Sequence, residues 1–227
     1  MIKKSHHKGL LLNLYLINAG ANMIGSLIMG TLNLWTPTEF FKLRRSYIID
    51  DGWVYILMMY PIIIAIGTAL QYIALRPLKM YFDSENSKEV NKSNLFRRAR
   101  RRLLILPPTI SLLNISMWTG LGLLGTLWLI IAKFIPSINA LAIYSYSWHT
   151  PYFALFRSIV VGCLAAGLAL LMVEAYSRKH LIPIFFPEGR LAVFKKVWKI
   201  SIRRRIQFLY FSGTVVPMII FVGTLFY

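Results

Sequence analysis

Acidic residues, histidines and cysteines are scarce in this sequence, which has 8 Asp and Glu, 4 His and 1 Cys in 227 residues. The single Cys163 excludes an intrachain disulfide. The four histidines lack the close paired spacing of zinc ligands; they are His6, His7, His149 and His180. No Asp or Glu lies in the interior of an apolar run, so an acid–base pair for a membrane-embedded enzyme is missing. We therefore predict no catalytic residue, no metal site and no cofactor within the chain.

Long apolar runs are abundant instead. Hydrophobic residues make up 57% of the chain, charged residues 15%, and the mean hydropathy is +0.58. Several runs exceed the roughly 20 residues that cross a bilayer core. The sequence predicts an all-α polytopic transmembrane helix bundle, a single domain over residues 1–227. The five predicted spans are about 9–35, 53–75, 103–134, 151–176 and 206–227. Within the third, Pro107 and Pro108 predict a stop for any helix arriving from the preceding basic segment.

The basic residues are concentrated between these runs. Of the 26 Lys and Arg, nine lie in 76–102, nine in 177–205 and three before the first span. Positively charged loops remain on the cytoplasmic side, so we predict cytoplasmic loops at 76–102 and 177–205, the N-terminus inside and Tyr227 outside. The net charge of +18 would suggest nucleic acid in a soluble domain. Because membrane topology explains it here, no nucleic-acid partner is predicted.

The second basic loop carries a helical pattern. After a turn at Pro187, Glu188 and Gly189, apolar residues recur at helical spacing: Leu191, Phe194, Val197, Trp198 and Ile202. Arg190 precedes this stretch, and Arg203, Arg204 and Arg205 close it. The pattern predicts an interfacial amphipathic helix that binds anionic lipid headgroups and couples the membrane spans to the cytoplasm. A solvated amphipathic connector is the alternative.

A few residues inside the spans are candidates for polar or close helix contacts. Asn18 and Asn22 are four residues apart, so they share a helix face, and they are expected to face other helices rather than lipid. Gly162 and Gly167 belong to the span richest in small residues, which favours close packing. Arg157 and Glu174 lie near opposite ends of the same span, and snorkelling to the interfaces is favoured over a buried polar site.

The stretch Gly120 to Gly125, "GLGLLG", matches the glycine pattern of dinucleotide-binding folds. It follows no soluble strand, lies in an apolar run and lacks an acidic residue about 20 positions later. Close helix packing is the better interpretation.

Three segments carry a family resemblance: "RKHLIPIFFPEGRL" (178–191), "SIRRRI" (201–206) and "VVPM" (215–218). They resemble bacterial membrane-bound class III adenylate/guanylate cyclases, in which a six-span module precedes a HAMP linker and a cytoplasmic cyclase domain. The recognisable sequence similarity covers about 40 residues. Related membrane modules also precede histidine kinases. It implies a homodimeric sensor and anchor module in the bacterial inner membrane, whose parent enzyme uses ATP or GTP with Mg.

The sequence contains no sixth span, HAMP segment or cyclase domain, so no catalytic residue is carried over, and the chain is expected to be a fragment. The resemblance does not name the signal, and a lipid or small apolar ligand is our expectation. A small transporter or channel subunit would need paired intramembrane charges, and Arg157 and Glu174 lie far apart on one helix. A haem site would need His149 and a methionine at facing depths.

Overall fold

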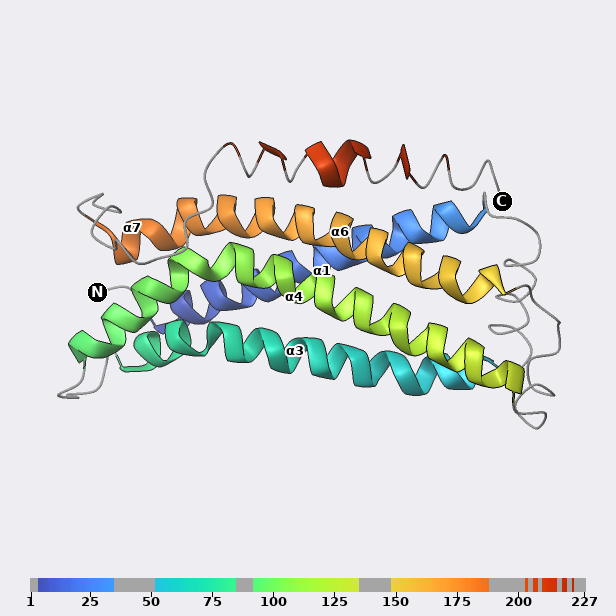
Figure 1. Cartoon of the computed structure of the whole chain (residues 1–227). Coiled ribbons are helices and arrows are strands. Elements are labelled where there is room, and N and C mark those ends of the chain that lie inside the picture. Colours follow the sequence, from blue (N-terminus) through green and yellow to red (C-terminus); the bar gives the residue numbers. More distant parts are fainter. Residues whose placement is uncertain are drawn as a thin grey trace.

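The computed structural model describes residues 4–34, 52–84, 92–134 and 148–187, with scattered positions between 203 and 222. Within this part of the chain the structure is helical and contains no strand, which confirms the all-α prediction. Four long helices run alternately up and down beside one another (Figure 1). They are α1 (Lys4–Leu34), α3 (Gly52–Ser84), α4 (Lys92–Phe134) and α6 (His149–Tyr176). A π-helical turn, η1 (Ser177–Leu181), continues α6 into the short α7 (Ile182–Phe185), and η3 (Phe211–Val215) lies further along the chain.

Three helices are long and apolar enough to cross a membrane, judged over the described residues. The apolar stretches are Gly9–Ile28, Ser93–Leu127 and Leu155–Phe185. They overlap the predicted spans 9–35, 103–134 and 151–176. The predicted span 53–75 lies within α3, and most of 206–227 lies outside the described residues. By length and composition, the helical fold is therefore compatible with a membrane protein.

The segment 76–102 was wrongly predicted to be a loop throughout. α3 continues to Ser84, and α4 begins at Lys92 and passes through Pro107 and Pro108 without ending. The proline stop fails because both rings are buried and because Leu103, Leu106 and Ile110, on either side of them, keep one face of α4 against the core. With 43 residues, α4 is about 65 Å long, roughly twice the thickness of a hydrocarbon core.

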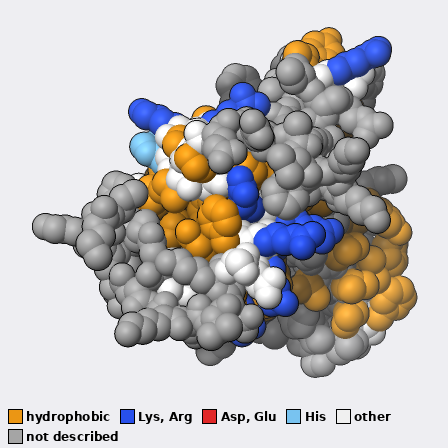
Figure 2. Space-filling view, turned by 90° about the vertical axis from the view of Figure 1, so that its left-hand side faces the viewer, with side chains coloured by type: hydrophobic (Ala, Val, Ile, Leu, Met, Phe, Trp, Pro, Cys, Tyr) orange, Lys and Arg blue, Asp and Glu red, His pale blue; other side chains and the backbone are white. Residues whose placement is uncertain are grey.

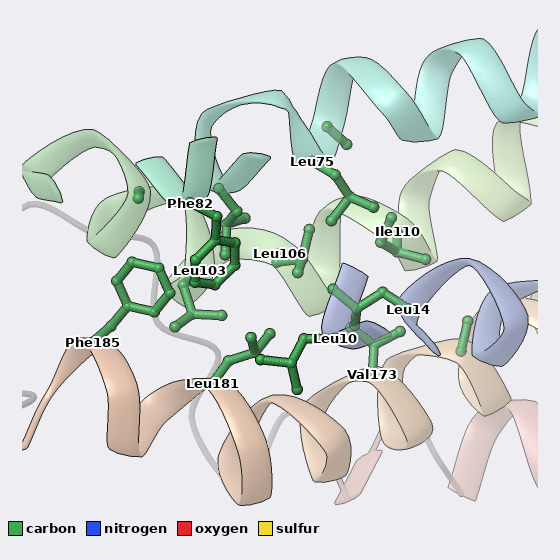
Figure 3. Packing of buried hydrophobic residues seen from close by; sticks show 14 of the residues in the cluster. Leu10, Leu14, Leu75, Phe82, Leu103, Leu106, Ile110, Val173, Leu181 and Phe185 are labelled. Carbon is green, nitrogen blue, oxygen red and sulfur yellow. The ribbon is translucent and has the colours of Figure 1, made fainter. Parts of the chain in front are cut away.

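One hydrophobic core joins all four long helices near their basic ends (Figure 3). Leu10 and Leu14 of α1 and Leu75 of α3 belong to this core, and Val173 of α6 lies beside Leu14. The remaining buried members come from all four helices and from the segment after α6: Ala21, Ala74, Leu78, Phe82, Ala99, Leu103, Leu106, Ile110, Ala169, Leu181, Phe185 and Phe186.

The spacing of buried residues explains the π-helical turn after α6. Buried residues after the middle of α6 recur at intervals of four, namely Ala169, Val173, Ser177, Leu181 and Phe185. In an α-helix of 3.6 residues per turn, such spacing drifts by about 40° per step around the axis. A π-helical turn holds more residues than an α-helical turn, and it returns Leu181 and Phe185 to the core side.

The half of the bundle away from the basic end is held by close approach of α4 and α6. A Cβ atom added at Gly122 would lie 2.5 Å from Cβ of Ser158, and one added at Gly162 would lie 2.9 Å from Cβ of Trp118. Gly25 of α1 similarly lies against Ala165, where an added Cβ would be 3.3 Å away. Small residues allow helix backbones to approach closely in lipid, where van der Waals packing drives association. "GLGLLG" thus contributes a packing surface, as predicted.

We expect Gly122→Ala and Gly162→Ala to lower the free energy of unfolding by about 1–3 kcal/mol each, because the added methyl group overpacks the α4–α6 contact. Gly120→Ala and Gly125→Ala are matched controls on α4, since an added Cβ meets nothing within 4 Å at either position. These controls should be neutral or stabilising by up to about 1 kcal/mol through helix propensity. Unfolding in detergent measures all four variants. Equal stability of the two pairs would contradict the close α4–α6 contact.

Candidate functional site

A network of side-chain amides joins α1, α3 and α4 inside the bundle. Asn18 of α1 donates from Nδ2 to Oε1 of Gln71 at 3.1 Å, and Gln71 donates from Nε2 to the backbone carbonyl of Leu14 at 3.2 Å. Asn114 of α4 donates from Nδ2 to Oδ1 of Asn18 at 2.9 Å. Asn22 donates from Nδ2 to Oδ1 of Asn114 at 3.1 Å. We call Asn18, Asn22, Gln71, Asn114 and Trp118 the amide network.

Trp118 closes the network. Its indole Nε1 donates to Oδ1 of Asn22 at 2.9 Å. Asn114 and Trp118 are four residues apart on α4, as Asn18 and Asn22 are on α1, so each helix presents two polar groups one turn apart. The relative exposure is 7% for Asn18, 5% for Gln71 and 2% for Asn114. Each of these buried amides both donates and accepts a hydrogen bond, which offsets the cost of removing it from water.

The chemistry available to the amide network is limited to hydrogen bonding. Amide side chains and an indole carry no charge, and none of them acts as a nucleophile or as a proton donor to substrate near neutral pH. Their hydrogen bonds are directional, so a helix that slides or rotates must break several of these bonds at once. The amide network therefore fixes the relative positions of α1, α3 and α4, and it can distinguish one packing of these helices from another.

An aromatic cluster occupies the basic end of the bundle. We define it as Tyr81 and Phe82 of α3, Phe96 of α4, and Phe185 and Phe186 at the end of α7. The Phe185 ring centroid lies 5.1 Å from that of Tyr81, 5.6 Å from that of Phe82 and 5.9 Å from that of Phe96. These separations are typical of favourable aromatic pairs. The cluster fixes the point at which the chain leaves α7 for Pro187 and the following basic segment.

Arginine covers this cluster. The guanidinium carbon of Arg100 lies 4.4 Å from the ring centroid of Phe186 and 4.9 Å from that of Phe96. These cation–π contacts join α4 to the residue after α7. Figure 2 shows Lys and Arg side chains beside hydrophobic surface on this end of the molecule.

Only part of the predicted coupling loop lies among the described residues. Pro187 is an exposed turn residue that follows Phe186, and Arg203 is exposed. The other predicted residues lie outside the described part of the chain: Glu188, Gly189, Arg190, Trp198, Arg204 and Arg205. The interfacial helix expected near 191–202 falls there too.

Arg157 does not snorkel, which corrects our prediction. It is 2% exposed, and it lies one helical turn before Val161, which packs against Gly25 of α1. Nearby, Thr126 of α4 donates its hydroxyl to the backbone carbonyl of Pro151 at 3.0 Å, and Gly122 accommodates Ser158, so α4 packs along the N-terminal part of α6. Arg157 is therefore a charged residue inside the bundle.

Glu174, at the other end of α6, makes an ion pair with Arg178, with 2.6 Å between Oε1 and Nη2. The glutamate side chain is 17% exposed and the arginine side chain 63% exposed. The two residues lie one turn apart at the basic end of α6, where Arg178 neutralises Glu174, the only acid of this helix. Gly162 and Gly167 are both buried, as close packing requires.

Asn18 and Asn22 were predicted from the sequence to make polar helix contacts, whereas Gln71, Asn114 and Trp118 were not. A signal was present, since Gln71 and Asn114 are amides inside apolar runs, as Asn18 is. Which of these residues meet depends on how three distant helices pack. Within the described residues, no group of three or more His, Cys, Asp or Glu is placed to hold a metal ion.

Comparison with known proteins returned no match among family models, curated proteins or solved structures.

A double-mutant cycle at Asn18 and Asn114 tests the amide network. Asn18→Leu and Asn114→Leu should each destabilise the protein by about 1–3 kcal/mol, because each leaves a buried amide without its partner. The double variant should lose less free energy of unfolding than the two single variants added together, with a coupling free energy of about 0.6–2 kcal/mol in a membrane bundle. Unfolding in mixed micelles gives the three values.

Ser26→Ala is the control, since this exposed hydroxyl donates only to the backbone carbonyl of Asn22 in its own helix. It should change stability by less than about 0.5 kcal/mol. Strictly additive losses at Asn18 and Asn114 would show that the two amides do not meet.

Proposed function

We propose that this chain is the membrane sensor and anchor module of a bacterial signal-transduction protein, with a class III adenylate/guanylate cyclase as its output. The observation that carries the proposal is the continuity of the core. Leu14, whose carbonyl accepts from Gln71 of the amide network, also packs in the cluster that contains Phe185. A change in helix packing at the amide network would therefore alter the packing of α7, directly before the basic segment.

The proposed topology has five spans in the inner membrane, with the N-terminus in the cytoplasm and Tyr227 outside. The distribution of Lys and Arg supports this orientation, because the ends of α3, α4 and α7 that share the aromatic cluster are also the basic ends. The segment 191–202 is proposed to lie on anionic headgroups as an amphipathic helix. The family resemblance adds a sixth span, a HAMP linker and a homodimeric catalytic domain that uses ATP or GTP with Mg.

The proposed mechanism is a shift between two packings of the bundle. A lipid or small apolar ligand that binds one packing better than the other shifts the population toward it, in proportion to that difference in affinity. The amide network supports such a mechanism, because side-chain amides can exchange partners and so favour discrete helix registers rather than a continuum. The aromatic cluster would pass the shift to Pro187 and the coupling segment.

A transporter or channel subunit receives less support. Ion and substrate pathways through a membrane are marked by paired intramembrane charges or by helices broken at the midplane. The amide network is uncharged, and in α6 the acid Glu174 pairs with Arg178 at the basic end rather than with Arg157.

The decisive experiment uses the product of the complete coding sequence in bacterial membranes. We expect membranes to convert ATP or GTP, with Mg, into a cyclic nucleotide. Phe185→Ala should change the rate per folded molecule about tenfold, since a shift of 1.4 kcal/mol between two packings changes their ratio by that factor. Phe134→Ala is the control, because Phe134 is 70% exposed at the opposite end of the bundle.

The outcomes separate the alternatives. Transfer of the ATP phosphoryl group to a histidine, without cyclic nucleotide, would keep the sensor role and replace the output by a kinase. Solute transport in liposomes with neither activity would contradict the proposal. Equal rates for Phe185→Ala and wild type, at equal folded protein, would contradict the route through the aromatic cluster.

A further inference from the structure

Arg102 is held in place at the basic end of α4 by a bond to another helix. Its Nε donates to the backbone carbonyl of Ala74 in α3 at 2.8 Å, and the residue is half-buried. The guanidinium has five N–H donors, and this bond uses one. Among the described residues, no other partner of Arg102 occurs, so the two terminal nitrogens are available to a ligand.

A second arginine lies on the same side of α4. Arg98 is four residues before Arg102, so the two side chains are neighbours one turn apart, and Arg98 is exposed. Because Arg102 reaches Ala74, this side of α4 borders α3. Arg97 is also exposed, but its position rotates it by about 100° from Arg98 around the helix, away from the α3 border.

An apolar stripe on α3 begins beside this pair. Ile73 precedes Ala74 and is 61% exposed, and Leu70 and Ile66 continue the same face at 42% and 49% exposed. The stripe runs from the arginine pair toward the middle of α3, into the apolar part of the bundle. Basic groups at one end of an exposed apolar stripe complement a molecule with an anionic head and hydrocarbon tails.

We propose that the border of α3 and α4 binds one anionic phospholipid, with its headgroup phosphate on Arg102 and Arg98 and an acyl chain along Ile66, Leu70 and Ile73. Arginine suits this role because its planar terminal nitrogens form paired hydrogen bonds to phosphate oxygens. The bond to Ala74 holds the guanidinium in one orientation before the lipid arrives, which lowers the entropy cost of binding. The site requires neither a catalytic domain nor the proposed signalling role.

The test is native mass spectrometry of the whole chain, titrated with phosphatidylglycerol or with zwitterionic phosphatidylcholine of the same acyl chains. The variants are Arg102→Gln, Arg98→Gln and, as the control, Arg97→Gln, each of which removes one positive charge. Since a basic residue near a headgroup contributes about 1 kcal/mol, we expect Arg102→Gln and Arg98→Gln to weaken phosphatidylglycerol binding about fivefold each. Arg97→Gln and all phosphatidylcholine affinities should remain close to wild type.

Equal weakening by all three variants would overturn the proposal, because it would indicate general attraction to a basic surface. Arg102→Gln could weaken lipid binding by disturbing the fold, because it removes the bond to Ala74. Arg98→Gln is free of this effect, since Arg98 makes no contact that holds the fold in the described structure. Inorganic phosphate at millimolar concentration distinguishes the source of the anion. If it displaced phosphatidylglycerol fully, the site would be one for free phosphate, and the assignment to a lipid would be wrong.

Discussion

Amide groups inside an apolar bundle must bond to one another, and this constraint determines how α1, α3 and α4 are placed. In hydrocarbon there is no water to satisfy Asn18, Gln71 and Asn114, so each unpaired donor or acceptor would cost free energy. The least costly arrangement brings the four amides together, with the Trp118 indole as an additional donor. Apolar packing alone would tolerate several rotations of these helices, whereas the amide network permits few. It therefore sets the register from which the rest of the bundle follows.

Two different kinds of packing extend that register along the bundle. On the side of the amide network away from the basic end, Gly122 and Gly162 allow α4 and α6 to approach until side chains meet backbone. On the basic side, Leu103 and Leu106 of α4, Leu75 of α3 and Leu181 form a core that ends in the aromatic cluster. The π-helical turn after α6 is what lets Leu181 and Phe185 both reach this core. A displacement of α4 would thus change the packing both at the α4–α6 glycine contacts and at the aromatic cluster.

Much of the fold is predictable from the sequence, because long apolar runs leave few choices of secondary structure. Apolar runs of sufficient length predict helices, and the all-α architecture follows from them. Local rules failed where tertiary packing overrides them. Pro107 and Pro108 do not end α4, since the buried face of that helix continues through them. Arg157 does not reach an interface, since it is buried inside the bundle. Of the amide network, the pair on one helix was predictable from spacing of four. Its partners Gln71 and Asn114 lie 53 and 96 residues from Asn18, and nothing local connects them.

Side-chain amides of three helices bond to one another inside the bundle, and nuclear magnetic resonance of the chain in lipid nanodiscs, with nitrogen-15 in Asn, Gln and Trp side chains, can detect these bonds. We expect through-space contacts between the indole proton of Trp118 and the Asn22 side chain, and between the Asn18 amide protons and Gln71. These amide protons should also exchange slowly in deuterated water. Rapid exchange, or amide protons of these residues that contact only water or lipid, would contradict the amide network.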